Sequence, residues 1–173
     1  MMSLLNNIRR TNKKTSFTNA FVHTFLIFGV GVFLGAAAKL LDIYTANIGN
    51  IFSQMSVWIF LCSMIAVWSN TPSRAAVNVF VFCIGMLITY YLTAELTSSV
   101  YSMTFVNGWL IFAVFSPALG FCVWFAKGKG LIPKIIIAGV VGAMLTIAII
   151  LFDKVRISDI VFSVLTVVIL LKK

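Results

Sequence analysis

Long, uninterrupted apolar segments constrain this chain more than any other feature. Hydrophobic residues make up 61% of the sequence and charged residues only 10%, whereas a soluble domain carries about 25% charged residues. A lipid bilayer is the natural solvent for such a chain, and its backbone must then be paired internally, in helices or a closed barrel. Barrel strands alternate in polarity over about 10 residues. The segments here are continuous and about 20 residues long, which favours membrane-spanning helices.

We therefore predict an all-α integral membrane protein with a single transmembrane domain, residues 1–173, built as a bundle of six transmembrane helices. The expected spans are residues 19–41, 53–69, 75–95, 105–126, 131–152 and 157–171. The last span lies near the lower limit of length for crossing a bilayer. Residues 1–17 form a basic segment before the first span.

The distribution of charge predicts how the chain is oriented. If the N-terminus is cytoplasmic, ten basic residues fall on the cytoplasmic side and three, Lys39, Lys154 and Arg156, on the outer side. This asymmetry satisfies the positive-inside rule. All four acidic residues and all four tyrosines also fall on the outer side. The sequence predicts a multi-pass protein of a bacterial cytoplasmic membrane with both termini inside.

The stretch GVGVFLGAAAKLLD, residues 29–42, lies within the first span and is rich in small residues. A nucleotide-binding loop is excluded because no strand precedes the glycines and no acidic residue follows at the required distance. Signal-peptide cleavage after the alanines is an alternative, but the apolar segment continues past them and is long enough to span. We favour a helix-packing face, because Gly31, Gly35 and Ala38 share one side of a helix and let a second helix approach closely in lipid.

The fifth span carries similar spacing twice, in the pair Ala138 and Gly142 and in the pair Gly139 and Ala143. We expect both spans to present a contact face. Two interpretations remain open. In the first, each face has a function and docks a partner protein or slides during transport. In the second, each face packs against other helices inside the bundle.

Polar and ionisable residues in spans are costly and are candidates for function. Those near the outer rim form the candidate substrate-binding set: Lys39, Asp42, Gln54, Glu95, Asn107, Trp109 and Asp159. Lys39 and Asp42 lie three residues apart on one helix face, so we expect them to be able to pair. One interpretation is an outward cavity with aromatic walls. The other is an aromatic belt at the membrane interfaces with loop charges in water, since all four tryptophans lie near span ends.

No pattern indicates catalysis, a metal or a cofactor, and we predict none of them. The three cysteines, Cys62, Cys83 and Cys122, lack metal-ligand spacing and fall in apolar segments, so we expect buried, inert thiols. The basic residues lie in short loops rather than on one face of a soluble fold, which excludes nucleic acid. The expected partners are the lipid bilayer and either another membrane protein or a second copy of the chain.

Four stretches resemble an uncharacterised family of small multi-spanning membrane proteins from Gram-positive bacteria: GAAAKLLDIYT, IFSQMSVWIFLC, RAAVNVFVFCIGMLITYYLTAEL and LFDKVRISDI. The resemblance covers most of the chain after about residue 25 and implies a bacterial inner-membrane location without a known activity, so no functional residue carries over from it. The architecture is also similar to that of the substrate-binding components of energy-coupling-factor vitamin transporters. Those components bind a ligand on the outer side and dock a partner through small residues of the first span, but their long first outer loop and ligand motif are not found here.

Two functional classes follow from these observations. The first, which we favour, is small-solute transport, either as a carrier or as the substrate-binding subunit of a transporter with an outward-facing site. The second is an immunity, regulatory or assembly factor that acts through helix–helix contacts. Convergence of Lys39, Glu95 and Asp159 in a cavity would favour the first class.

Overall fold

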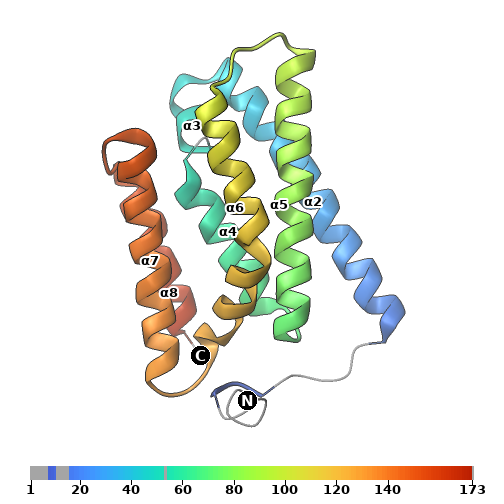
Figure 1. The fold of residues 1–173 in the computed structure, drawn as a ribbon, viewed down its shortest axis with the longest axis vertical. Helices are drawn as coiled ribbons and strands as arrows, with labels where there is room; N and C mark the ends of the chain where they lie inside the picture. Colours follow the sequence, from blue (N-terminus) through green and yellow to red (C-terminus); the bar gives the residue numbers. More distant parts are fainter. Residues whose placement is uncertain (1–7, 11–15, 53, 173) are drawn as a thin grey trace.

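The computed structural model describes residues 8–10, 16–52 and 54–172, and the longer regular elements among them are all helices. Figure 1 shows them as a bundle of roughly upright helices. In chain order they are α2 (Phe17–Tyr44), α3 (Ala46–Phe52), α4 (Met55–Trp68), α5 (Pro72–Leu96), α6 (Met103–Trp124), the 3-10 helix η1 (Phe125–Lys127), α7 (Leu131–Phe152) and α8 (Ile157–Leu171). The predicted all-helical architecture is confirmed.

Four of these helical segments are long and apolar enough to cross a membrane: α2, α5, α7 and the continuous stretch of α6 and η1. The other two predicted spans are short helices: α8 has the predicted bounds, whereas α4 is shorter than the predicted residues 53–69. Helix α4 has 14 residues and α8 has 15, which correspond to about 21 and 22 Å of helix against a hydrocarbon core of about 30 Å. At α4 the cause is local, because Gln54 and Ser69 adopt extended backbone conformations at its two ends.

Helices α2 and α5 make the closest helix contact in the fold, through glycines on both sides. A methyl group added at Gly31 would lie 2.5 Å from the backbone oxygen of Phe82, and one at Gly35 would collide with the backbone oxygen of Met86. In return, Gly85 of α5 faces the backbone of α2. These glycines remove the side-chain bulk that would otherwise separate the two backbones.

A chain of polar contacts also joins α2 and α5 near the other end of the pair. Arg74 donates hydrogen bonds to the backbone oxygen of Ala20 and, over 2.8 Å, to Thr24 Oγ1. Thr24 Oγ1 donates in turn to Asn78 Oδ1 over 2.7 Å. Arg74, Thr24 and Asn78 therefore all have hydrogen-bond partners, as polar groups in a membrane interior require.

Helix α4 occupies the centre of the bundle, where it packs against α5, α6, α7 and α8. Its Trp58 is 1% exposed, and Trp124, at the end of α6, is also 1% exposed. An aromatic belt would place both rings at the interface, but their indole N–H groups find acceptors inside: the backbone oxygen of Phe52 at 2.8 Å and that of Ser69 at 2.7 Å. Trp68 alone among the four tryptophans is exposed.

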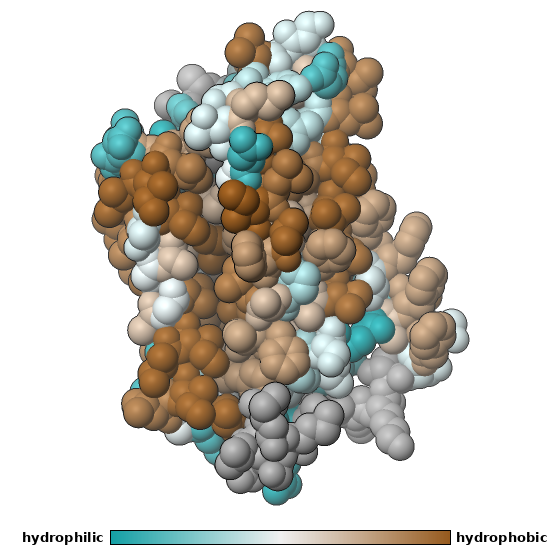
Figure 2. Space-filling view, in the orientation of Figure 1, coloured by the Kyte–Doolittle hydropathy of each residue, from teal (hydrophilic) through white to brown (hydrophobic). Residues whose placement is uncertain are grey.

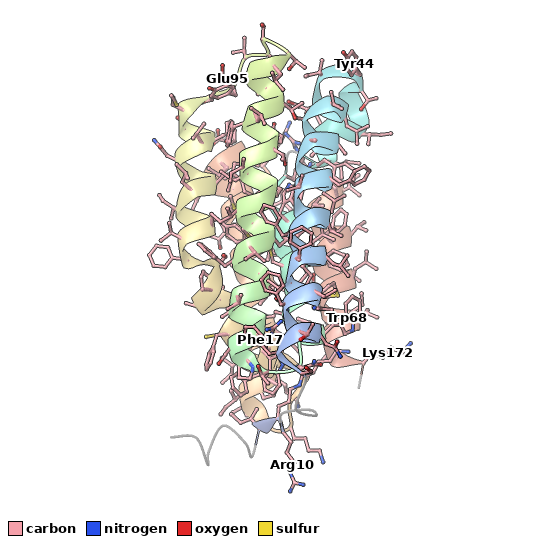
Figure 3. All side chains as sticks on the ribbon, turned by 90° about the vertical axis from the view of Figure 1, so that its right-hand side faces the viewer. Arg10, Phe17, Tyr44, Trp68, Glu95 and Lys172 are labelled. Atoms are coloured by element: carbon pink, nitrogen blue, oxygen red, sulfur yellow. The ribbon has the colours of Figure 1, made fainter. Side chains whose placement is uncertain are left out.

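The two ends of the bundle differ in charge. Figure 3 places Tyr44 and Glu95 at one end, and Arg10, Trp68 and Lys172 at the other. All four acidic residues lie at or near the first end, which we call the acidic end: Asp42, Glu95, Asp153 and Asp159. We call the opposite end the basic end. Between the ends the visible face is mostly hydrophobic (Figure 2).

Arg9 anchors the start of the described chain to the basic end. Its guanidinium donates hydrogen bonds to the backbone oxygens of Trp124, at 2.5 Å, and Val67, at 2.8 Å, and lies 4.2 Å from the centre of the Trp124 ring. Nearby, the backbone N–H of Lys129 donates to the oxygen of Ile8 over 2.8 Å. Partial burial lowers the pKa of Arg9. A single cation thus satisfies carbonyl groups at the C-terminal ends of α4 and α6, where a positive charge is favourable.

Candidate functional site

An aromatic pocket of about 350 Å³ opens at the acidic end between α2, α5 and α6. We call it the tyrosine pocket. Its lining residues come from α2, α5, the connection after α5, α6 and the end of α7: Lys39, Asp42, Tyr90, Tyr91, Val100, Tyr101, Ser102, Phe105, Trp109 and Phe152. Three of the predicted rim residues, Lys39, Asp42 and Trp109, therefore share one cavity.

The charged part of the pocket is an ion pair within α2. Lys39 Nζ lies 3.0 Å from Asp42 Oδ2, and the two side chains are 3% and 33% exposed. Tyr90 supports both partners, because its hydroxyl donates to Asp42 Oδ2 over 3.4 Å and its ring centre lies 5.3 Å from Lys39 Nζ. A buried ammonium group requires such partners, since desolvating an unpaired charge is strongly unfavourable. The predicted pairing is present, and it leaves the charged part of the pocket electrically neutral.

Three tyrosines form the aromatic wall. The ring centres of Tyr90 and Tyr91 are 5.3 Å apart, as are those of Tyr91 and Tyr101, and both pairs meet edge to face, a favourable geometry for aromatic rings. The Tyr101 hydroxyl donates a hydrogen bond to the exposed Glu95, and this bond, together with the negative charge of the carboxylate, raises the pKa of Tyr101. The phenol therefore stays protonated, and remains a donor, to a higher pH than a free tyrosine. Glu95 reaches the pocket only through this contact.

The chain matches no protein-family model, no curated protein and no solved structure. The geometry and chemistry of its own residues are therefore the basis for assigning a function.

Gln54 and Asp159, two further members of the predicted set, lie elsewhere and join α4 to α8. Gln54 Oε1 accepts a hydrogen bond from Ser158 Oγ over 2.6 Å. The carboxylate of Asp159 accepts one from Ser56 Oγ and one from the backbone N–H of Arg156, at 2.9 Å. Asp159 thus caps the first turn of α8, where a negative charge is favourable. These contacts are structural in character, and the convergence of Lys39, Glu95 and Asp159 in one cavity, expected of the transport class, is not observed.

Asn107 is exposed on α6 and does not line the tyrosine pocket. The predicted rim residues therefore all lie toward the acidic end of the bundle, but their side chains point in different directions around it. The sequence predicted the tyrosines on the outer side and, in one interpretation, a cavity with aromatic walls, but it did not show which rings meet. The adjacent pair Tyr90 and Tyr91 is the signal that locates this wall.

The small residues of the first and fifth spans have different surroundings. Gly31, Gly35 and Ala38 are buried in the monomer, and the two glycines meet α5 directly. Ala138, Gly139, Gly142 and Ala143 of α7 are exposed, and a methyl group added at either glycine of α7 would meet nothing within 4 Å.

A second cavity, of about 340 Å³, lies between α6 and α7 and is lined mostly by apolar groups. Gly139 and Ala143 belong to its wall, as does Cys122, which is exposed rather than buried as expected. The other two cysteines are buried, with Cys62 Sγ and Cys83 Sγ 3.5 Å apart. Among the described residues, no group of three or more His, Cys, Asp or Glu side chains is placed to hold a metal ion.

Proposed function

We propose that this protein binds a small solute in the tyrosine pocket, as a carrier or as the substrate-binding subunit of a transporter. The observation that carries the proposal is the ion pair between the buried Lys39 and the more exposed Asp42, which lines a cavity with aromatic walls. A few polar groups that converge among apolar and aromatic walls are typical of small-molecule sites. A volume of about 350 Å³ lies at the small end of the range for such pockets and favours a small solute.

The proposal includes an orientation. The basic end carries most of the positive charge, so the positive-inside rule places it in the cytoplasm of a bacterium, with both termini there and the pocket facing outward. In this arrangement α4 and α8 cross the membrane with the polar segments at their ends, which makes six crossings. The resemblance to small Gram-positive membrane proteins agrees with this location.

A small void adjoins the pocket on the side of the bundle interior. Its volume is about 20 Å³, and Tyr90, Tyr91 and Trp109 line both this void and the tyrosine pocket. In a carrier, these three rings would separate the outward site from the interior of the bundle. A carrier must let the solute pass these rings, whereas a binding subunit need not. Movement of the rings therefore distinguishes the two forms of the proposal.

A thermal-shift screen on the detergent-purified protein tests the proposed function. The panel contains amino acids, vitamins, nucleobases and organic cations. A ligand present at 100 times its dissociation constant should add about 2.7 kcal/mol to the free energy of unfolding. We expect Lys39→Gln to reduce the shift and Asn107→Ala, an exposed site outside the pocket, to retain it in full. Absence of any shift with folded protein would contradict the proposal.

The open face of α7 favours a second candidate function. Gly139 and Gly142 leave room for a neighbouring helix, as expected of an immunity, regulatory or assembly factor that binds another membrane protein. Gly142→Leu should then prevent co-purification of a specific partner from native membranes without unfolding the protein. If the variant retains every partner of the native protein, this candidate is wrong.

A further inference from the structure

We infer that the solute is a zwitterion and, specifically, a free α-amino acid with an uncharged apolar or aromatic side chain. This assignment of substrate class rests on the proposed function of the tyrosine pocket. It follows from three properties of the pocket: unfilled hydrogen-bonding capacity on both charged groups, a balanced charge, and the composition of the walls.

Both charged groups retain capacity for a ligand. An ammonium group has three hydrogens to donate and a carboxylate oxygen accepts more than one hydrogen bond. Among the described residues, Lys39 donates only to Asp42, and every contact of the Asp42 carboxylate is to Oδ2, from Lys39 and Tyr90. Two donors on Lys39 and the Oδ1 atom of Asp42 therefore have no partner within the part of the chain that the structure describes, although Lys39 is almost fully buried. Unfilled capacity on the buried Lys39 is unfavourable unless a ligand or water satisfies it, and the Asp42 carboxylate is exposed enough for a ligand to reach it.

The charge balance of the pocket selects a ligand that carries both signs. A simple anion would meet Lys39 but would also be repelled by Asp42, and a simple cation would face the reverse conflict, in a site where desolvation strengthens both effects. A zwitterion satisfies both groups. In an α-amino acid a single carbon separates the ammonium and carboxylate groups, so both can reach two charged atoms that lie 3.0 Å apart.

The remaining walls define the side chain. Tyr91, Tyr101, Phe105 and Trp109 line the pocket, and no charged residue besides the ion pair does so among the lining residues described. Glu95 is engaged by the Tyr101 hydroxyl. Contact between these rings and an apolar or aromatic side chain of the ligand is favourable. A charged side chain of the ligand would instead be desolvated without a partner.

A series of phenylalanine analogues on the native protein tests the assignment without any mutation. The detergent-purified protein is titrated calorimetrically with phenylalanine, with its amide, which lacks the carboxylate, and with 3-phenylpropionate, which lacks the ammonium group. We expect phenylalanine to bind and each analogue to bind at least about tenfold more weakly, as the loss of a charged hydrogen bond implies. Equal affinity for phenylalanine and either analogue would overturn the zwitterion assignment.

Two variants assign the charges to residues. Lys39→Gln should remove the preference for phenylalanine over its amide, whereas Asp42→Asn should remove the preference for phenylalanine over 3-phenylpropionate. Asn107→Ala should leave both preferences unchanged. If folded Lys39→Gln and Asp42→Asn proteins retain the preferences of the native protein, the assignment is wrong.

A zwitterionic lipid headgroup presents similar chemistry, so the series includes glycerophosphoethanolamine. If this compound binds in a Lys39-dependent way and phenylalanine does not, the pocket holds a headgroup and the amino-acid assignment fails. If only a singly charged solute from the wider panel binds, the proposed function stands and the substrate class is wrong. If no compound binds the folded protein, the proposed function itself fails.

Discussion

Glycines in the membrane helices of this protein occur in two environments with different consequences. Gly31 and Gly35 touch the backbone of α5, where even a methyl group would collide with carbonyl oxygens that belong to a rigid helix. Gly139 and Gly142 face open space on α7. The same small residue therefore determines a helix contact in α2 and leaves a vacant surface in α7.

Substitution at these positions should separate the two roles. We expect Gly31→Ala to lower the free energy of unfolding by about 1–3 kcal/mol, the usual cost of overpacking. Gly139→Ala is the matched control, and it should be neutral or stabilising by up to about 1 kcal/mol, because alanine favours the helix. Unfolding followed by circular dichroism in detergent measures both. Equal effects at the two sites would show that the α2–α5 contact is not as close as described.

For single residues, the sequence predicts position along the bundle axis better than the direction in which the side chain points. The spacing of Lys39 and Asp42 was sufficient to predict their pairing, because both residues lie on one helix. The sequence predicted Gln54, Asn107 and Asp159 at the outer rim, but the direction in which each side chain points depends on how its helix is rotated about its axis. That rotation is set by packing between helices far apart in sequence, and the near-uniform hydrophobicity around α6 gives little sign of where Asn107 points.

Helix ends account for most of the difference between the predicted and observed elements. An apolar segment shows where a helix is possible, but its limits depend on how the terminal carbonyl and N–H groups are satisfied. Gln54 and Ser69, which were predicted within the second span, adopt extended conformations, and α4 has 14 residues. The helical α3 in the preceding connection was not predicted, because a short helix of seven residues carries little signal of its own.

Arg9 provides a test of how these ends are held. Arg9→Ala removes two hydrogen bonds from a charged donor and a contact with the Trp124 ring, and we expect it to lower the free energy of unfolding by about 1.5–3 kcal/mol. The neighbouring Arg10 is exposed, so Arg10→Ala should change stability by less than about 0.5 kcal/mol. Thermal unfolding of the two variants makes the comparison. If both variants match the native protein, Arg9 does not fasten the ends of α4 and α6.

The whole molecule is organised around the difference between its ends. The sequence correctly indicated an all-helical membrane bundle, because hydrophobicity and the need to pair the backbone leave few other solutions. The pocket required the structure, since its walls come from α2, α5, α6 and α7, and only the folded chain brings Lys39, Tyr101 and Phe152 together. Trp58 and Trp124 lie near helix ends, but both are buried and their N–H groups donate to backbone carbonyl groups of the protein.

The proposed orientation can be tested in intact cells. In a background with the three native cysteines replaced by alanine, Thr97→Cys and Lys172→Cys each place one thiol at an exposed position, at the acidic and basic ends respectively. We expect a membrane-impermeant maleimide to label the first variant in intact cells and the second only after lysis. The reverse pattern would show that the protein has the opposite orientation, with the tyrosine pocket facing the cytoplasm.

The central position of α4 has a consequence for how the protein is made. Its polar end is completed by α8, and Ser56 and Asp159, which share a hydrogen bond, are 103 residues apart in the chain. At a synthesis rate of about 5–20 residues per second, roughly 5–20 s pass between the translation of the two residues. During this interval the short helix is already made but lacks the partner that satisfies its buried hydroxyl. Assembly of the bundle around α4 therefore finishes only after α8 has been synthesised.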